Sequence, residues 1–449
     1  MNNTFLKKFS LYFIPNVLFL YLISAINSPL FFIEEINLIN IINFFRSISP
    51  IIIFFVFFFL LIFKKNFSLI FLLFSFFLLS TLVGFFLSKN QIFFNLYWTF
   101  SALSLVCFLE YYQDEETLLK NFHQIILIIF SIIAISIVSR LVVDDFYSYQ
   151  NFYAHKIMSP SQNFFNQPVP RSSGVARILL VIFLFLFSFV VINNKKKLKN
   201  CFCFVILFII SYVIWIIQNR GTLYFLIILN FLTLIISIIY QNKNLFIKWI
   251  VIFLLPFVFV QSLSLKINRD YDELIILNKH PNPNVQMNEA EKIKLDILNN
   301  HSLLSVNQRW KTPIETSGRL EIWKKSYEII KKYPFFGNGP QSDRQMLGLN
   351  ASNIVIYVLL CGGLFSLIIF LIFIYYLLKD LLILLKKIIF QNLYLELNNF
   401  FIIYSFLLIF FLGFRGIVEN SFSVFSLDML LFLLSIKYIY KFKDFEKKY

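Results

Sequence analysis

Long apolar runs, each close to the thickness of a lipid bilayer, follow one another along most of this chain. One of them reads "NIVIYVLLCGGLFSLIIFLIFIYYLL" over residues 353–378. Because a helix needs about 20 apolar residues to cross the hydrocarbon core, such runs predict membrane-spanning helices. The composition agrees, since 59% of the residues are hydrophobic and only 14% are charged. A soluble domain cannot bury so large an apolar fraction, and an integral membrane protein is predicted.

The apolar runs predict an all-α, polytopic fold with about twelve transmembrane helices. The stretch 28–46 is also apolar, but it carries Glu34 and Glu35 and is expected to form a loop or an interfacial segment. The expected spans lie near residues 9–26, 47–63, 67–88, 91–110, 121–140, 175–193, 201–217, 221–240, 246–264, 352–378, 397–414 and 417–437.

Basic residues in the short loops predict the orientation, because lysine and arginine favour the cytoplasmic side. With the N-terminus in the cytoplasm, the lysine clusters and the tail from Lys437 fall on that same side. Two long loops then lie outside, over residues 144–176 and 265–351. The predicted organisation has three parts: an N-terminal transmembrane bundle over 1–264, a large, partly helical outer loop over 265–351, and C-terminal transmembrane helices with a basic cytoplasmic tail over 352–449.

The formal net charge of +16 belongs largely to these basic clusters beside the spans. Such clusters are the usual signal of membrane topology, and we therefore expect no nucleic-acid partner. The four cysteines lie in apolar runs without a CxxC pair, and the four histidines are scattered. We expect neither a disulfide framework nor a metal site.

One charged segment, "RLEIWKKSYEIIKKY" over 319–333, interrupts the apolar runs and predicts an amphipathic helix. Its charges fall on one half of the helix at about 100° per residue, except for Arg319, which lies in the apolar half near Trp323. A buried arginine needs an anion, which is either a ligand or a carboxylate such as Glu315. After Pro334, the turn "FFGNGP" is expected to expose backbone amides that also hold an anion.

The arginines of the chain share the outer side of the predicted topology or the outer ends of spans. Guanidinium groups pair with phosphate oxygens through two hydrogen bonds, which predicts an outward-facing site for a phosphate-bearing ligand. Alternatives remain open for Arg220, which caps a helix C-terminus on another interpretation, and for Arg415, which forms an i,i+4 pair with Glu419. Asp428 requires a basic partner from a neighbouring helix. The outer arginines are Arg140, Arg171, Arg177, Arg220, Arg269, Arg309, Arg319, Arg344 and Arg415.

Four segments in order resemble the O-antigen ligase and O-antigen polymerase superfamily. The segment "SGRLEIWKKSYEIIKKYPFFGNGP" before "NIVIYVLLCGGLFSLIIF" resembles the family's R-x-x-x-W helix, its proline–glycine turn and the Gly-Gly-Leu-like membrane helix that follows. "QNRGTLYFLIILN" and "RSSGVARILLVIFLFLF" resemble its arginine-containing elements beside spans. "FRGIVENSFSVFSLDMLLF" resembles its C-terminal arginine and glutamate span. The likeness extends from about residue 168 to residue 437.

The resemblance implies a GT-C-like glycosyltransferase of the bacterial inner membrane, with cytoplasmic termini and a bilayer around it. It implies glycans on undecaprenyl pyrophosphate as substrates, no cofactor and no metal, and a chain-length regulator as a partner. It assigns Arg319, Arg220 and Arg415 to the leaving pyrophosphate. Glu419 is the candidate base, although a structural pair with Arg415 remains open. The expected substrate-binding residues are Arg171, Arg177, Trp323 and Arg344.

One difference from the ligase sequences indicates which branch of the superfamily this chain resembles. Ligases usually carry a His-Asn pair where the span after the long loop begins, whereas this chain has "NASN" over 350–353. The missing histidine favours a polymerase of O-antigen or another surface polysaccharide over a ligase that transfers the glycan to lipid A core. A lipid-linked oligosaccharide flippase or transporter is a further alternative. It needs charges within the spans, and the apolar runs contain few.

Overall fold

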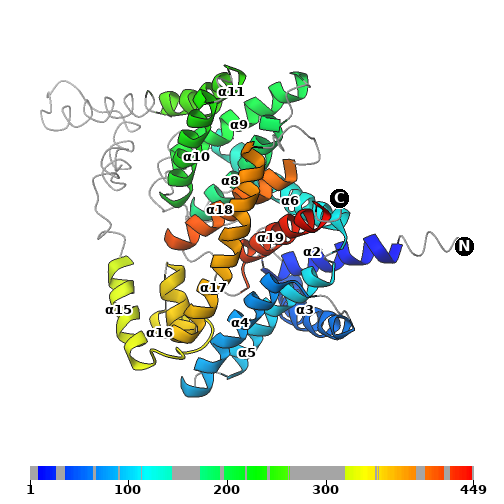
Figure 1. Ribbon diagram of the computed structural model, residues 1–449, viewed down its shortest axis with the longest axis vertical. Helices are drawn as coiled ribbons and strands as arrows, with labels where there is room; N and C mark the ends of the chain where they lie inside the picture. Colours follow the sequence, from blue (N-terminus) through cyan, green and yellow to red (C-terminus); the bar gives the residue numbers. More distant parts are fainter. Residues whose placement is uncertain are drawn as a thin grey trace, which may run out of the picture. The chain divides into compact units, whose positions relative to one another are not determined.

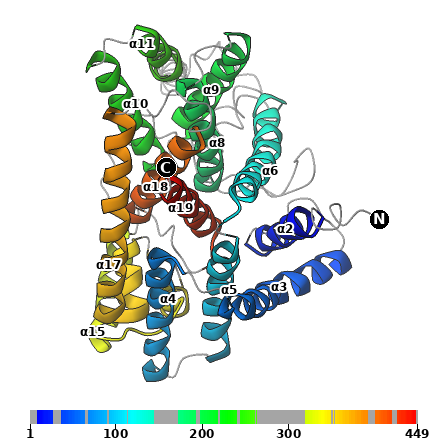
Figure 2. The ribbon, with the colours of Figure 1, turned by 45° about the vertical axis from the view of Figure 1, so that its right-hand side comes forward.

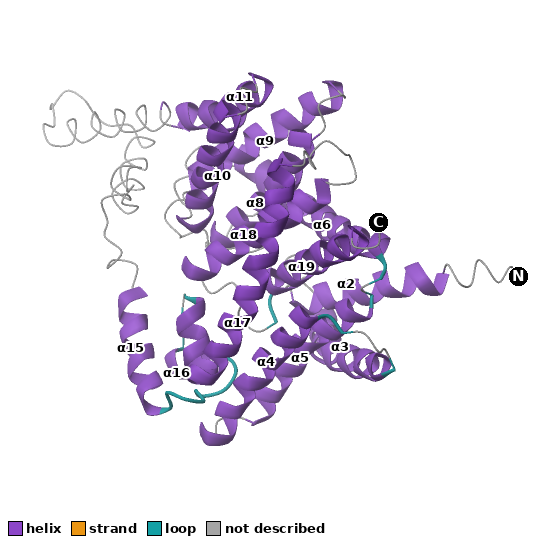
Figure 3. Ribbon diagram, in the orientation of Figure 1, coloured by secondary structure: helices purple, strands orange, loops and turns teal. Residues whose placement is uncertain are grey.

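The protein, seen in a computed structural model, is helical almost throughout the part of the chain that the structure describes, and no strand occurs in that part (Figure 3). The described residues are 9–26, 36–63, 67–88, 92–112, 114–143, 172–192, 197–217, 220–239, 243–260, 262, 319–348, 351, 353–390, 400–418 and 425–446.

The helices follow one another along the chain with the labels of Figure 1. Their bounds are η1 Phe9–Phe13, α2 Ile14–Ile26, α3 Ile36–Ile62, α4 Leu69–Ser88, α5 Ile92–Tyr111, α6 Glu116–Val143, α8 Ser172–Ile192, α9 Lys197–Ile217, α10 Arg220–Ile239, α11 Lys243–Trp249, η3 Ile250–Leu254, α15 Arg319–Lys332, α16 Ser342–Leu347, α17 Ile354–Phe390, α18 Phe400–Val418 and α19 Leu427–Glu446.

The chain divides into two compact units. The first comprises Met1–Ile128 and Ser317–Tyr449, and the second comprises Ile129–Thr316. In the first unit α3 packs on α5, α4 packs on α17, and α18 packs on α19. Figure 2 shows α4 running beside the lower part of α17. Stacked phenylalanines fill part of its core, as Phe19 and Phe122 do with ring centroids 4.2 Å apart.

The second unit contains the end of α6 together with α8, α9, α10, α11 and η3. Helix α8 packs against α9 and α10, and η3 packs against α9. Phe183 and Phe187 of α8 contact Phe253 of η3 with ring centroids 5.8 and 5.9 Å apart. The Lys248 ammonium donates a hydrogen bond to the Val190 carbonyl at 3.0 Å, which connects the last turn of α11 to the end of α8.

Several described helices are apolar enough to cross a membrane. The longest windows are Phe44–Ile62, Glu116–Ile135, Ile354–Lys386 and Phe400–Ile417. Large apolar side chains remain exposed on them, such as Phe59 at 59% and Ile135 at 68%, which suits lipid contact and not water. The shorter apolar helices of the described chain are Leu11–Ile26, Leu69–Gly84, Gly174–Val190, Phe202–Trp215, Gly221–Ile235 and Phe246–Val260. The expectation of an all-helical membrane protein is confirmed.

Some span boundaries differ from the sequence prediction. Helix α3 already begins at Ile36 and continues through Pro50, so the second half of the stretch 28–46, expected as a loop or an interfacial segment, is helical. Helix α18 runs to Val418 and α19 begins only at Leu427, where the sequence predicted a span over 417–437. Lys437 therefore lies within α19, where it is buried, and not at the start of a cytoplasmic tail.

Candidate functional site

Helix α15 confirms the amphipathic helix that the sequence predicts over 319–333. It ends at Lys332, two residues before Pro334, which cannot continue a helix. Ser326 on its apolar half is buried, whereas Tyr327 departs from the prediction and is 58% exposed. The Lys331 ammonium lies 4.5 Å from the Tyr327 ring centroid and covers part of that ring. Apart from Arg319, the charged residues of α15 are all exposed: Glu321, Lys324, Lys325, Glu328, Lys331 and Lys332.

Arg319 opens α15 and is half-buried, as its place in the apolar half predicts. Glu315, the carboxylate that the sequence offered as its partner, lies outside the described residues. One helical turn further on, the Trp323 indole Nε1 donates a hydrogen bond to the Ala351 carbonyl at 3.2 Å. Trp323 thus anchors α15 to the segment that leads into α17, and its only polar atom is occupied by the protein.

The turn after α15 overturns the expectation of exposed amides. The Asn338 N–H donates to the Leu360 carbonyl at 2.9 Å, and the Gly339 N–H donates to the Cys361 carbonyl at 2.8 Å. The Gly337 N–H closes the turn on the Tyr333 carbonyl at 3.0 Å. These amides complete the backbone of α17 and are not available to an anion, because α17 breaks at this level and leaves carbonyls to be satisfied.

The break itself is at Gly363, whose φ of 64° lies in the left-handed region. Beyond it, the Leu364 and Phe365 amides donate to the carbonyls of Pro334 and Phe335 at 2.8 and 3.0 Å. In an unbroken helix these amides would bond to the carbonyls four residues earlier. The turn therefore replaces a helical turn of α17 with its own backbone.

Helix α16 contributes a buried carboxylate that the sequence analysis missed. Asp343 is fully buried, with Oδ1 accepting the Arg344 N–H at 2.9 Å and Oδ2 accepting the Ala351 N–H at 3.1 Å. Burial raises the pKa of the Asp343 carboxyl, and these two N–H donors and the Arg344 charge oppose the shift. Ala351 thus donates its N–H to Asp343 and accepts the Trp323 indole N–H on its carbonyl.

Asn353 caps the start of α17 and ties it to α18. Its Oδ1 accepts the amides of Val355 and Ile356 at 2.8 and 3.2 Å, which is the usual bond of an N-cap residue. Its Nδ2 donates to the Ile417 carbonyl at 3.0 Å, near the end of α18. Asn353 is the last residue of the "NASN" segment, and these bonds give it a structural role. We call the hydrogen-bonded set Trp323, Asp343, Ala351, Asn353 and Ile417 the polar junction.

Arg415, two residues before Ile417, forms an ion pair with Asp428 of α19 at 2.5 Å. Their side chains are 8% and 3% exposed, so the pair is shielded from water. The expectation that Asp428 needs a basic partner from a neighbouring helix is confirmed. The alternative partner of Arg415, Glu419, lies outside the described residues. The pair joins α18 to α19. Because Asp428 compensates the charge of Arg415 inside the protein, we assign this arginine a structural role.

Among the arginines whose side chains the structure describes, Arg344 is the most open to a ligand. Its side chain is exposed on α16, next to Asp343. Within the described part of the chain, its guanidinium forms no ion pair with a carboxylate at contact distance. Its neighbour Asp343 holds the Arg344 backbone through the Oδ1 bond, so the guanidinium projects from a fixed point beside the polar junction.

The remaining predicted residues lie elsewhere. Arg220 is the first residue of α10 and follows the end of α9 at Ile217 by three residues. Arg177 is half-buried on α8. Both belong to the second unit, whereas Arg319, Trp323, Arg344 and Arg415 belong to the first. Arg171 and Glu419 lie outside the described residues.

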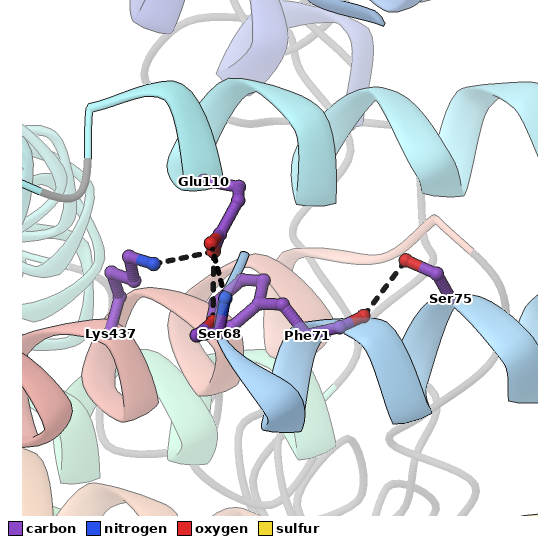
Figure 4. A network of polar contacts seen from close by, with 5 residues as sticks. All are labelled: Ser68, Phe71, Ser75, Glu110 and Lys437. Atoms are coloured by element: carbon purple, nitrogen blue, oxygen red, sulfur yellow. Dashed lines mark hydrogen bonds and ion pairs between the residues drawn. The ribbon is translucent and has the colours of Figure 1, made fainter. Parts of the chain in front are cut away.

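A second buried ion pair lies within the first unit (Figure 4). The Lys437 ammonium of α19 donates to Glu110 Oε2 of α5 at 2.5 Å, and the side chains are 3% and 2% exposed. Glu110 also accepts the Ser68 N–H at 2.8 Å and the Ser68 hydroxyl at 3.0 Å at the start of α4. The ammonium lies 4.6 Å from the Phe71 ring centroid. This cluster joins α4, α5 and α19.

Buried polar groups also include His123 of α6, whose ring nitrogens have no hydrogen-bond partner among the described residues. The ring packs edge-on against Tyr404 at 5.3 Å between centroids. No group of three or more metal-ligating side chains comes together within the described ranges. The His123 ring is thus enclosed by aromatic side chains, and it makes no cluster with the other histidines.

Comparison with known proteins adds no relative: no family model, no curated protein and no solved structure matches this chain.

Proposed function

We propose that this protein is a polymerase of O-antigen or a similar surface polysaccharide, acting at the outer face of the bacterial inner membrane. The fold proposed with it is GT-C-like, with about twelve spans. The proposal rests on the resemblance of four sequence segments to the O-antigen ligase and polymerase superfamily. In the proposed orientation, α15 and α16 lie on the outer side, which is the side where lipid-linked repeat units are joined.

The chemistry proposed is a glycosyl transfer between two glycans, each carried on undecaprenyl pyrophosphate. A hydroxyl oxygen of the repeat unit attacks the anomeric carbon of the growing chain, and the hydroxyl proton passes to a base. The bond from the anomeric carbon to the pyrophosphate oxygen breaks, and its electron pair leaves with the pyrophosphate. Guanidinium groups that meet this developing charge stabilise the transition state.

The structural observation that best supports the proposal is the pair of arginines placed beside the polar junction. Arg344 is exposed and forms no ion pair among the described residues, and Arg319 is half-buried one turn before Trp323. The hydrogen bonds from Ala351 to Asp343 and Trp323 fix the backbone of α16 and α15, which carry the two arginines. Because the two helices are already ordered, ligand binding costs less conformational entropy. Arg319 and Arg344 are therefore the proposed pyrophosphate ligands, and Arg415 has the structural role. Arg220 remains a proposed ligand from the second unit.

A deletion strain complemented with variants tests this function. Polymerase loss leaves core carrying a single repeat, whereas ligase loss leaves only unmodified core, so one polysaccharide gel separates the two. We expect Arg344→Ala to abolish long chains and leave the single-repeat band, and Lys332→Ala, which removes another exposed charge of the same region, to leave long chains intact. Unmodified core alone would favour the ligase, and unchanged long chains in both Arg344→Ala and Arg319→Ala would refute the site.

Transport of lipid-linked glycan is the second candidate, and the buried Glu110–Lys437 pair favours it. Ionisable side chains inside a membrane bundle often mark transport or proton pathways. The few charges of the apolar runs had counted against this function, but the structure buries two of them together. A flippase needs no glycosyl transfer, so a purified protein that extends lipid-linked oligosaccharide without an ion gradient decides for the polymerase.

A further inference from the structure

The turn Pro334–Gly339 connects the charged helix α15 to α16, and its sequence position suggests a water-exposed loop. Its backbone behaves differently. The carbonyls of Pro334 and Phe335 and the amides of Asn338 and Gly339 all bond to backbone groups on the two sides of the α17 break. Gly337, Asn338 and Gly339 are buried. Backbone outside a helix is tolerated in a membrane only where such internal partners satisfy it.

The turn also fits against α4 at a point where no side chain has room. A Cβ added at Gly84 would overlap the backbone of Phe336 and Gly337. A Cβ at Gly363 would meet the backbone of Phe335 and Phe336 in the same way. The turn is therefore wedged between two apolar helices, and Figure 1 shows it running from the end of α15 toward α17 and α4.

The depth of this contact follows from both helices. Gly84 lies about 6 Å before the end of α4 at Ser88, at 1.5 Å per residue. In α17, Gly363 lies about 24 Å from Lys379, the first charged residue after the break, within a hydrocarbon core of about 30 Å. With Ser88 taken as the outer edge of the hydrocarbon core and Lys379 as its inner edge, both helices place the turn roughly 6 Å inside that core.

The exposed side chains of the turn are apolar, as a position inside the hydrocarbon core requires. Phe335 is 64% exposed and Phe336 is 41% exposed, and no polar side chain of the turn is exposed beside them. We propose that Pro334–Gly339 is a re-entrant element lodged in the membrane, with Phe335 and Phe336 in contact with lipid hydrocarbon chains. The occupant of this aromatic surface is lipid and not water, and α15 lies at the interface above it. The inference does not depend on the proposed polymerase activity.

Labelling of single cysteines tests this placement, with the four native cysteines replaced and the protein held in lipid nanodiscs, where both faces meet the reagent. Phe335→Cys is compared with Tyr327→Cys, because Phe335 and Tyr327 are 64% and 58% exposed in the protein. We expect a membrane-impermeant maleimide to label Phe335→Cys at least about tenfold more slowly, because the charged reagent does not enter hydrocarbon. Both variants should label fully after denaturation.

A spin label at the Phe335→Cys site separates lipid contact from burial in protein. Lipid contact predicts high accessibility to oxygen and low accessibility to a water-soluble nickel chelate, and Phe336→Cys serves as the second position. Equal labelling rates for Phe335→Cys and Tyr327→Cys would overturn the inference. Low accessibility to both oxygen and nickel would overturn it too, because the side chain would then lie inside the protein.

Discussion

Buried charges are the costly residues of this protein, and each one that the structure describes in detail is compensated. The Glu110 carboxylate accepts hydrogen bonds from the Lys437 ammonium and from the N–H and hydroxyl of Ser68, so three donors replace water. Arg415 and Asp428 form the other closed pair. A buried pair of this kind adds little net stability over apolar residues, but the loss of one partner is expensive.

This asymmetry predicts a double-mutant result for Lys437 and Glu110. Lys437→Met removes the positive charge that balances the buried Glu110 carboxylate, and we expect a loss of about 3 to 5 kcal/mol of stability. Adding Glu110→Gln to Lys437→Met should recover most of that loss, because no charge remains. The thermal midpoint of the detergent-solubilised protein measures both variants. A double variant as unstable as the sum of the single ones would contradict the pair's role.

The close contact at Gly84 predicts a second stability effect. Gly84→Ala places a Cβ on backbone atoms of Phe336 and Gly337, which move only with the turn, so we expect a loss of about 1 to 3 kcal/mol. Gly413→Ala in α18 is the matched control, because nothing lies within 4 Å of its Cβ. There alanine should be neutral or stabilise the helix by up to about 1 kcal/mol. Equal thermal midpoints for the two variants would count against the wedged turn.

At the scale of elements, α17 and the turn Pro334–Gly339 form one unit, because each completes the hydrogen bonds of the other. The polar junction then fixes α15 and α16 against the start of α17. Asp343 is central to it, since its two oxygens bond to the amides of Arg344 and Ala351. The stability of the junction should depend on the protonation of this carboxyl.

The sign of that dependence follows from the raised pKa of Asp343. The folded junction takes up a proton at higher pH than the unfolded chain, so the stabilisation is complete below the ordinary aspartate pKa of about 3.9 and is lost as the pH rises through the raised pKa. We expect hydrogen exchange around Ala351, corrected for its intrinsic rate, to slow as the pH falls toward this range. Asp343→Asn should remove the pH dependence, and an unchanged dependence in that variant would assign it to another group.

The sequence predicted some of these elements and not others, for physical reasons. The charge pattern of α15 repeats with the helical period, so both the helix and its exposed face were predictable. The wedged turn was not, because its bonds to Leu360 and Cys361 are made by backbone atoms, which leave no side-chain pattern. Asp343 resembled any loop aspartate until the fold buried it. The need of Asp428 for a basic partner was predicted correctly, because a lone carboxylate lay within the last predicted span.

At the scale of the whole molecule, contacts group the chain differently from its order. Residues near both ends of the chain build the first unit, which contains the polar junction, Arg319, Arg344 and the Arg415–Asp428 pair. Arg220 and Arg177 belong to the second unit. If the polymerase uses arginines from both units, these arginines must contact the same substrate. Arg220→Ala with retained long chains would limit the site to the first unit, whereas loss of long chains would extend it to α10.

The most direct test of the account is chain extension by the purified protein. The protein is reconstituted in liposomes without an ion gradient and supplied only with repeat units on undecaprenyl pyrophosphate. The account predicts a ladder of chains longer than one repeat, which Arg344→Ala abolishes and Lys332→Ala does not. A folded, reconstituted protein that produces no chain beyond the single repeat, or that extends chains equally well with Arg344→Ala and Arg319→Ala, would contradict it.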